Sequence, residues 1–233
     1  MAKFSKPLQN GFLHDRNGPS NPVVRLIKPS LLELIPWLKR FSWEKELSIE
    51  AALWLGRMRI FKIDEEGGLC RGEMRPVLRS MSDETRNRFI AWLGFVGQKE
   101  DNGWAKYIIP LINEDWPRER RYRTLASAKA WIGLLGETGD DFHRVYETVK
   151  TFLAPLETEY CPLYRFTREH GNKKPLTTIF PESTLDLMNR ITPLSLTRPP
   201  LEIQKVLALI EDVEPRLITD QRYLRLTDLV EKN

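Results

Sequence analysis

Four arginines and two aromatic residues crowd into residues 116–123, whose sequence is WPRERRYR. Guanidinium and aromatic groups in one place suit phosphate contact, base stacking or an anionic protein surface. The candidate binding residues of this loop are Arg118, Arg120, Arg121, Tyr122 and Arg123. The alternative is a solvated loop whose arginines pair with Glu114, Asp115 and Glu119 and whose aromatic rings only close a helical hairpin.

The best acid–base cluster is Asp140-Asp141-Phe142-His143, with Glu147 one helical turn further on. A catalytic interpretation makes His143 a general base oriented by Glu147, because residues i and i+4 share a helix face. We favour a capping acid beside a surface histidine, since the sequence places no nucleophile or oxyanion-binding group nearby. Nucleotide-binding, zinc-protease and serine-hydrolase motifs are missing from the sequence. We therefore expect no catalytic residue and a protein that is not an enzyme.

The cysteines and histidines do not form a recognisable metal site. Cys161 and His170 are separated by eight residues, a spacing that matches no structural zinc pattern. We expect no metal ion and no cofactor. The only other cysteine is Cys70, and two cysteines cannot staple a chain of 233 residues, which indicates a reducing compartment.

The net charge of +4 comes from the N-terminus. Residues 1–30 hold five basic residues and one acid, which leaves 31 charges of each sign in the rest of the chain. The turn-forming run at residues 17–22 lacks helical periodicity, so we expect residues 1–29 to form an extended basic arm. Lys3, Lys6 and Arg16 are its candidate binding residues.

Apolar stripes at helical spacing predict that residues 30–233 form one α-helical domain. Ser82 can cap a helix, Thr124 or Ser127 the helix at 125–137, and Asp220 the last one. Residues 156–180 carry a weak pattern, and a small β-hairpin or an ordered loop is expected near 60–70. The expected helices cover residues 44–58, 83–98, 102–116, 125–137, 142–152, 182–191 and 200–212, with a last one after Asp220.

A faint internal repeat of proline flanked by apolar residues recurs 34 to 45 residues apart, at Pro36, Pro76, Pro110, Pro155 and Pro193; the alternative is chance spacing of the sixteen prolines. Helix-pair repeats of the HEAT kind recur at about 40 to 47 residues. The predicted fold is therefore all-α, with antiparallel helical hairpins stacked either as a short HEAT-like solenoid or as an irregular bundle.

The sequence favours a cytoplasmic protein with no membrane association. Its longest nearly apolar stretch, at 90–97, is far shorter than the roughly 20 residues that span a bilayer. The basic N-terminus is not followed by the apolar segment of a secretory signal.

One stretch resembles a known group of proteins. It comprises WAKYIIPLINEDWP at 104–117, RYRT at 121–124 with Ser127, and GDDF at 139–142 with Val145. Over residues 82–230 the chain is similar to the C-terminal helical regions of large bacterial proteins that carry N-terminal SIR2-like NADase or NTPase parts, many implicated in anti-phage defence. The resemblance implies an all-α sensor or scaffold whose chemistry resides in another segment or subunit. The chain lacks their nucleotide-binding segment, which implies a fragment or a stand-alone subunit.

These observations predict a non-enzymatic helical scaffold or sensor that binds a protein partner. The resemblance implies a bacterial anti-phage defence complex, with a larger NTPase, nuclease or NADase as the partner. The alternative is a nucleic-acid-binding accessory subunit that uses residues 118–123 and the N-terminal arm.

Overall fold

The computed structural model describes residues 71–122, 124–155, 163–169, 174–193 and 201–232, together with eight helical positions between Ile49 and Ile60. The predicted arm with Lys3, Lys6 and Arg16, the hairpin near 60–70 and Arg123 lie outside the described residues. The expected helix at 44–58 is helical at each of its described positions.

Helices and turns make up the described residues, which contain no strand, and the all-α prediction is confirmed. No helix among them is long and apolar enough to cross a membrane. The α-helices are α5 (Met74–Ser80), α6 (Asp83–Lys99), α7 (Ile109–Asp115), α8 (Leu125–Leu135), α9 (Phe142–Val149), α10 (Tyr164–Thr167), α11 (Leu176–Ile179), α12 (Pro181–Ile191), α13 (Leu201–Val213) and α14 (Gln221–Glu231). Shorter elements are a π-helix, η1 (Trp104–Ile108), and the 3-10 turns η2 (Arg120–Tyr122), η3 (Gly139–Asp141), η4 (Lys150–Phe152) and η5 (Pro215–Thr219).

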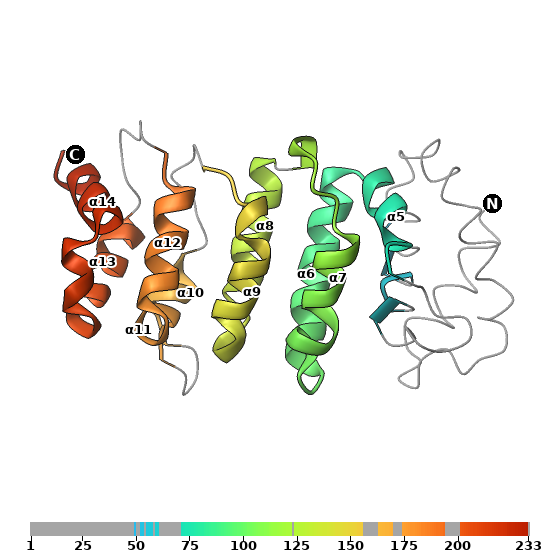
Figure 1. Cartoon of the computed structure of the whole chain (residues 1–233), viewed down its shortest axis with the longest axis horizontal. Helices are drawn as coiled ribbons and strands as arrows, with labels where there is room; N and C mark the ends of the chain where they lie inside the picture. Colours follow the sequence, from blue (N-terminus) through green and yellow to red (C-terminus); the bar gives the residue numbers. More distant parts are fainter. Residues whose placement is uncertain are drawn as a thin grey trace, which may run out of the picture.

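The helices stand side by side in an elongated row, with α5 toward one end and α13 and α14 at the other (Figure 1). Along the row, α6 packs against α8, and α10 and α11 pack against α13. A second series runs parallel to it, in which α7 packs against α9, α9 contacts α12, and α12 packs against α14. The buried residues of these helices form one connected core. The HEAT-like geometry of the pairs stays a prediction.

Several helices begin where capping residues and a proline in the sequence predicted them. The side chains of Ser82, Thr124 and Asp220 each accept a hydrogen bond from a backbone N–H of the first helical turn, at the starts of α6, α8 and α14. Such a cap satisfies one of the free N–H groups of a helix start and contributes about 1 kcal/mol. Pro181 occupies the first position of α12, where a missing N–H costs nothing.

Two elements differ from the prediction because of proline. The helix expected at 102–116 is split, with the π-helix η1 preceding Pro110 at the start of α7. Pro110 has no N–H to donate, and its ring crowds the carbonyl four residues earlier, so a widened turn relieves the clash. The sequence patterns also missed α5, whose Pro76 lies in the first turn, where proline is tolerated.

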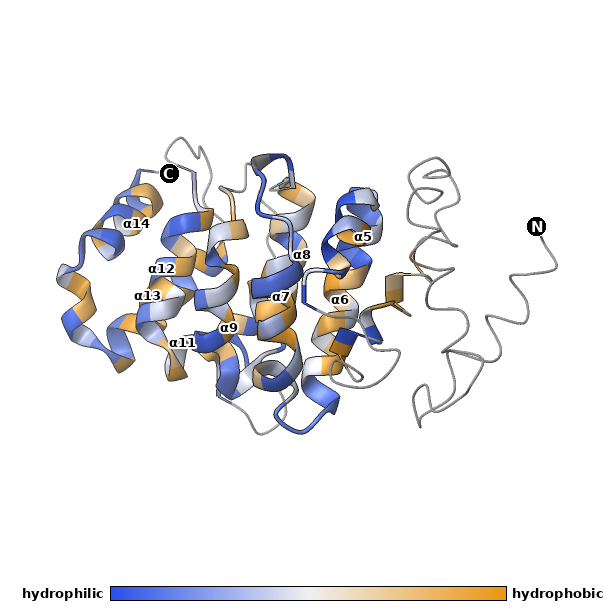
Figure 2. Ribbon diagram, turned by 45° about the vertical axis from the view of Figure 1, so that its right-hand side comes forward, coloured by the Kyte–Doolittle hydropathy of each residue, from blue (hydrophilic) through white to orange (hydrophobic). Residues whose placement is uncertain are grey.

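Tryptophan and phenylalanine rings form the centre of the core. The fully buried Trp131 lies edge-on to Trp116, with ring centroids 4.7 Å apart, and stacks on Phe152 at 5.7 Å. Trp131 is therefore a core residue. Apolar and hydrophilic residues alternate along the labelled helices in Figure 2, as expected when one face of a helix is buried.

Candidate functional site

The arginine-rich loop joins α7 to α8, and its aromatic residues are buried. Trp116 is 2% exposed and packs on Trp131. Tyr122 is 7% exposed, and its hydroxyl donates to the carbonyl oxygen of Arg79 at 3.5 Å. Both rings therefore close the hairpin, as the alternative interpretation expected, and are not presented for stacking against nucleic-acid bases.

Two arginines of the loop lie at the surface. Arg118 and Arg121 are exposed, and Arg120 begins the 3-10 turn η2. Arg118 Nη2 donates to the carbonyl oxygen of Asn113 at 3.2 Å, near the end of α7. The guanidinium of Arg121 lies over the Tyr122 ring, 4.7 Å from its centroid. Tyr122 thus supports one of the predicted binding residues.

The carboxylates expected to neutralise the loop are paired with arginines from earlier in the chain. Arg59 pairs with both Asp115 and Glu114, and its Nε lies 2.8 Å from Asp115 Oδ2. Arg71 Nε lies 3.3 Å from Glu114 Oε1, and Arg79 pairs with Glu119. These long-range ion pairs tie two earlier segments to the loop.

Asp115 is the anchor of this arrangement. Its side chain is 0% exposed and that of Arg59 is 2% exposed. The Met74 N–H, at the start of α5, donates to Asp115 Oδ1 at 3.0 Å. Burial raises the pKa of the Asp115 carboxyl, while the Arg59 guanidinium and the Met74 N–H act in the opposite direction.

The surface around the loop is an arginine rim, defined here as Arg71, Arg75, Arg79, Arg118 and Arg121. Arg75 and Arg79 are four residues apart on α5 and share one side of it, whereas Arg71 precedes the helix and Gly72, with φ +82°, lies between them. The side chain of Arg71 is 79% exposed and that of Arg79 is 43% exposed. A hydrogen bond from its own backbone N–H, together with Arg79 and Arg121, lowers the pKa of the Glu119 carboxyl within this rim.

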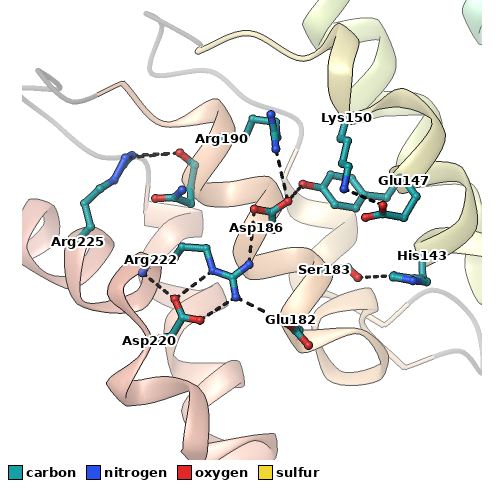
Figure 3. A network of polar contacts seen from close by, with 12 residues as sticks. His143, Glu147, Lys150, Glu182, Ser183, Asp186, Arg190, Asp220, Arg222 and Arg225 are labelled. Carbon is teal, nitrogen blue, oxygen red and sulfur yellow. Dashed lines mark hydrogen bonds and ion pairs between the residues drawn. The ribbon is translucent and has the colours of Figure 1, made fainter.

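A second candidate site lies around His143. A cleft of about 480 Å³ opens between α9, the start of α12 and η5, and His143 and Ser183 line it (Figure 3). His143 Nδ1 and Ser183 Oγ share a hydrogen bond at 2.8 Å. Glu147, the proposed orienting group, accepts from Lys150 Nζ at 2.7 Å. Ser183 follows His143 by 40 residues, and no sequence motif marked the contact.

Beside the cleft, a polar network joins three helices. The hydroxyl of Tyr146, on α9, donates to Asp186 on α12. Arg222, at the start of α14, lies 3.5 Å from Asp186 Oδ1 and 2.7 Å from Asp220 Oδ2 (Figure 3). Burial, followed by the Asp186 hydrogen bond, raises the pKa of Tyr146. The acidic and basic groups here connect successive helices of the stack.

Another cleft, of about 470 Å³, lies among the turns at 97–104 and 136–141 and residues 165–179. Arg165 and Glu137, which both line it, form an ion pair. Among the residues that the structure describes, no three His, Cys, Asp or Glu side chains are placed to hold a metal ion. Cys161 and His170 lie outside them.

In comparisons with protein-family models, curated proteins and solved structures, nothing matches this chain.

Proposed function

We propose that this protein is a non-enzymatic helical scaffold that binds a protein partner in the cytoplasm. The proposal rests on one observation: the side chains that could do acid–base chemistry are bonded to other helices. Asp115, His143 and Asp186 each bond to a residue of another helix, in contacts spanning about 40 or more residues of sequence. These groups hold the stack in shape, which leaves its extended rims as the functional surfaces.

The mixed charge of the arginine rim supports a protein partner. Glu114 and Glu119 lie among the arginines, with side chains 24% and 40% exposed. Interleaved charges of both signs suit a protein surface, which offers both, better than a polyphosphate, which the carboxylates repel. The resemblance to defence proteins extends the proposal: the partner is a larger NTPase, nuclease or NADase of a bacterial anti-phage complex.

Nucleic-acid binding is the second candidate function, and the local excess of arginine favours it. Residues 71–80 and 114–123 contain seven arginines and four acids. Such an excess attracts phosphates in a strongly salt-dependent manner. The burial of Trp116 and Tyr122 removes the base-stacking part of this candidate function.

The test is capture of partners by the tagged full-length chain expressed in its native host, followed by mass spectrometry. We expect one protein to be retained in a defined stoichiometry after a wash at physiological salt. Recovery of the chain alone, as a monomer, would contradict the scaffold proposal. Fluorescence anisotropy with single- and double-stranded DNA over a salt series tests the second function, which predicts binding that weakens steeply as salt rises.

A further inference from the structure

We propose that the cleft of about 470 Å³ among the turns at 97–104 and 136–141 and residues 165–179, here called the turn cleft, binds a segment of the partner protein that carries both a basic and an acidic side chain. The inference rests on the scaffold function proposed above. It adds a docking site to that function and names the chemistry of the segment that the site accepts.

The charges that line the turn cleft are sorted by segment. All four lining carboxylates lie on the turns at 97–104 and 136–141: Glu100, Glu137, Asp140 and Asp141. All three lining cations lie within residues 165–174: Arg165, Arg168 and Lys174. The acidic turns follow α6 and α8, and the cations lie on and beside α10, which comes after α8 along the row (Figure 1). The cleft is therefore negative on its α6 and α8 side and positive on its α10 side.

Four of these seven charged side chains are free to pair with a partner. Glu137 and Arg165 pair with each other, and Asp141 Oδ1 lies 3.6 Å from Arg144 Nη1. The other four are exposed and form no ion pair with any residue that the structure describes: Glu100, Asp140, Arg168 and Lys174. Two acids and two cations therefore remain to complement charges of the opposite sign on a ligand.

Contacts between the three segments hold the turn cleft in shape. Gln98 Nε2 donates to the carbonyl oxygen of Glu137 at 3.2 Å, which joins the end of α6 to the turn after α8. The ion pair of Glu137 and Arg165 joins that turn to α10. A Cβ at Gly136 would lie 2.8 Å from Arg165 Cδ, so a glycine is needed for Arg165 to lie this close to the turn. Segments that are already linked lose less conformational entropy when a ligand binds.

The lining favours a protein segment over a small molecule or a nucleic acid. Small-molecule sites are lined mainly by apolar and aromatic side chains, whereas the larger apolar residues here are only Trp104, Leu176 and Ile179. A polyphosphate would face the free carboxylates of Glu100 and Asp140, which repel it. A protein segment can offer a cation to these acids, a carboxylate to the cations opposite, and an apolar side chain to Ile179, which is 40% exposed.

Photo-crosslinking locates the bound segment. The tagged full-length chain carries p-benzoylphenylalanine in place of Ile179, and the control carries it in place of Leu224, which is 50% exposed on α14. Both are irradiated in a lysate of the native host, and the crosslinked peptides are sequenced by mass spectrometry. We expect position 179 to capture one peptide of the retained partner, with residues of both charge signs. Capture of the same peptide from position 224, or of a peptide with one charge sign, would overturn the inference.

A charge inversion tests the recognition with a labelled synthetic copy of the crosslinked peptide. The inverted variant carries Glu100→Lys, Asp140→Lys, Arg168→Glu and Lys174→Glu, which leaves the net charge unchanged. The control makes the same number of changes at exposed positions outside the cleft, Asp212→Lys, Asp228→Lys, Lys205→Glu and Lys232→Glu. Circular dichroism establishes that both variants are folded.

We expect the inverted variant to bind the peptide at least roughly tenfold more weakly than wild type, and the control to stay within about twofold. A second peptide, with its basic and acidic residues exchanged, should bind the inverted variant more tightly than wild type. Equal binding of the first peptide to wild type and the inverted variant, or equal losses in both variants, would overturn the inference.

Partner capture separates this inference from the scaffold proposal. A partner that wild type retains but that does not crosslink to position 179 rules out the turn cleft, while the scaffold proposal stands. A wild-type chain that retains no partner contradicts the scaffold proposal and overturns this inference with it.

Discussion

Arg225 Nη2 lies 2.7 Å from the carbonyl oxygen of Thr192, the residue that ends α12. Arg86 does the same for α5, donating to the carbonyl oxygen of Met81 at 2.6 Å. The last carbonyl groups of a helix have no hydrogen-bond partner within it and carry partial negative charge. A guanidinium at this position donates the missing hydrogen bond and supplies the opposite charge. Arg225 and Arg86 therefore cap the C-termini of α12 and α5 inside the stack.

Replacing Arg225 with Met should lower the free energy of unfolding by about 1–3 kcal/mol, because the Thr192 carbonyl loses a charged donor within a partly buried site. Burial also lowers the pKa of Arg225, which is consistent with a side chain held inside the stack. Urea denaturation measures the change. The control is Arg216→Met, whose side chain is 79% exposed, and an equal loss there would show that the capping contact contributes nothing specific.

The buried pair of Arg59 and Asp115 should behave as a unit. Changing Asp115 to Ala leaves Arg59 buried without its main counter-charge, and we expect a loss of about 3–5 kcal/mol. Adding Arg59→Met should restore part of that loss, because the uncompensated charge is then removed. A double-mutant cycle by urea denaturation measures the coupling, and strictly additive losses would contradict a direct interaction.

These contacts also explain how much of the molecule was predictable. The caps at Ser82 and Asp220 bond to groups within three residues, so their types and spacing revealed them. The Arg59–Asp115 pair spans 56 residues and the His143–Ser183 pair spans 40. Such pairs depend on which helices become neighbours, and helical periodicity does not specify that.

The candidate binding loop was also only partly predictable from the sequence. The loop itself and its exposed Arg118 and Arg121 were predictable from composition, because arginines between two apolar stripes remain at the surface. The contribution of α5 was not, since it depends on how α5 packs beside the loop. Two of the five arginine-rim residues, Arg75 and Arg79, lie on a helix that the sequence pattern missed.

Asp220 predicts a pH dependence of stability. Its hydrogen bonds to Arg222 lower the pKa of the folded carboxyl below the unfolded value of about 3.9. The unfolded chain therefore binds a proton more readily, so this contribution is complete above about pH 5 and is lost as the pH falls through the folded pKa. Asp220→Asn retains a capping side chain but removes the charge. The stability difference between wild type and this variant should shrink from pH 6 to about pH 3, and a constant difference would contradict the assignment.

Two glycines of α6 offer a matched test of the packing between helices. A Cβ at Gly97 would lie 2.6 Å from the Trp104 ring, whereas a Cβ at Gly94 meets nothing within 4 Å. Gly94→Ala should stabilise the protein by about 0.5–1 kcal/mol, because alanine favours the helix over glycine. Gly97→Ala gains the same propensity but must displace a ring that is 4% exposed, so we expect a net loss of about 1–3 kcal/mol. Thermal unfolding of both variants measures the contrast, and two equal gains would mean that η1 does not pack against α6 in this way.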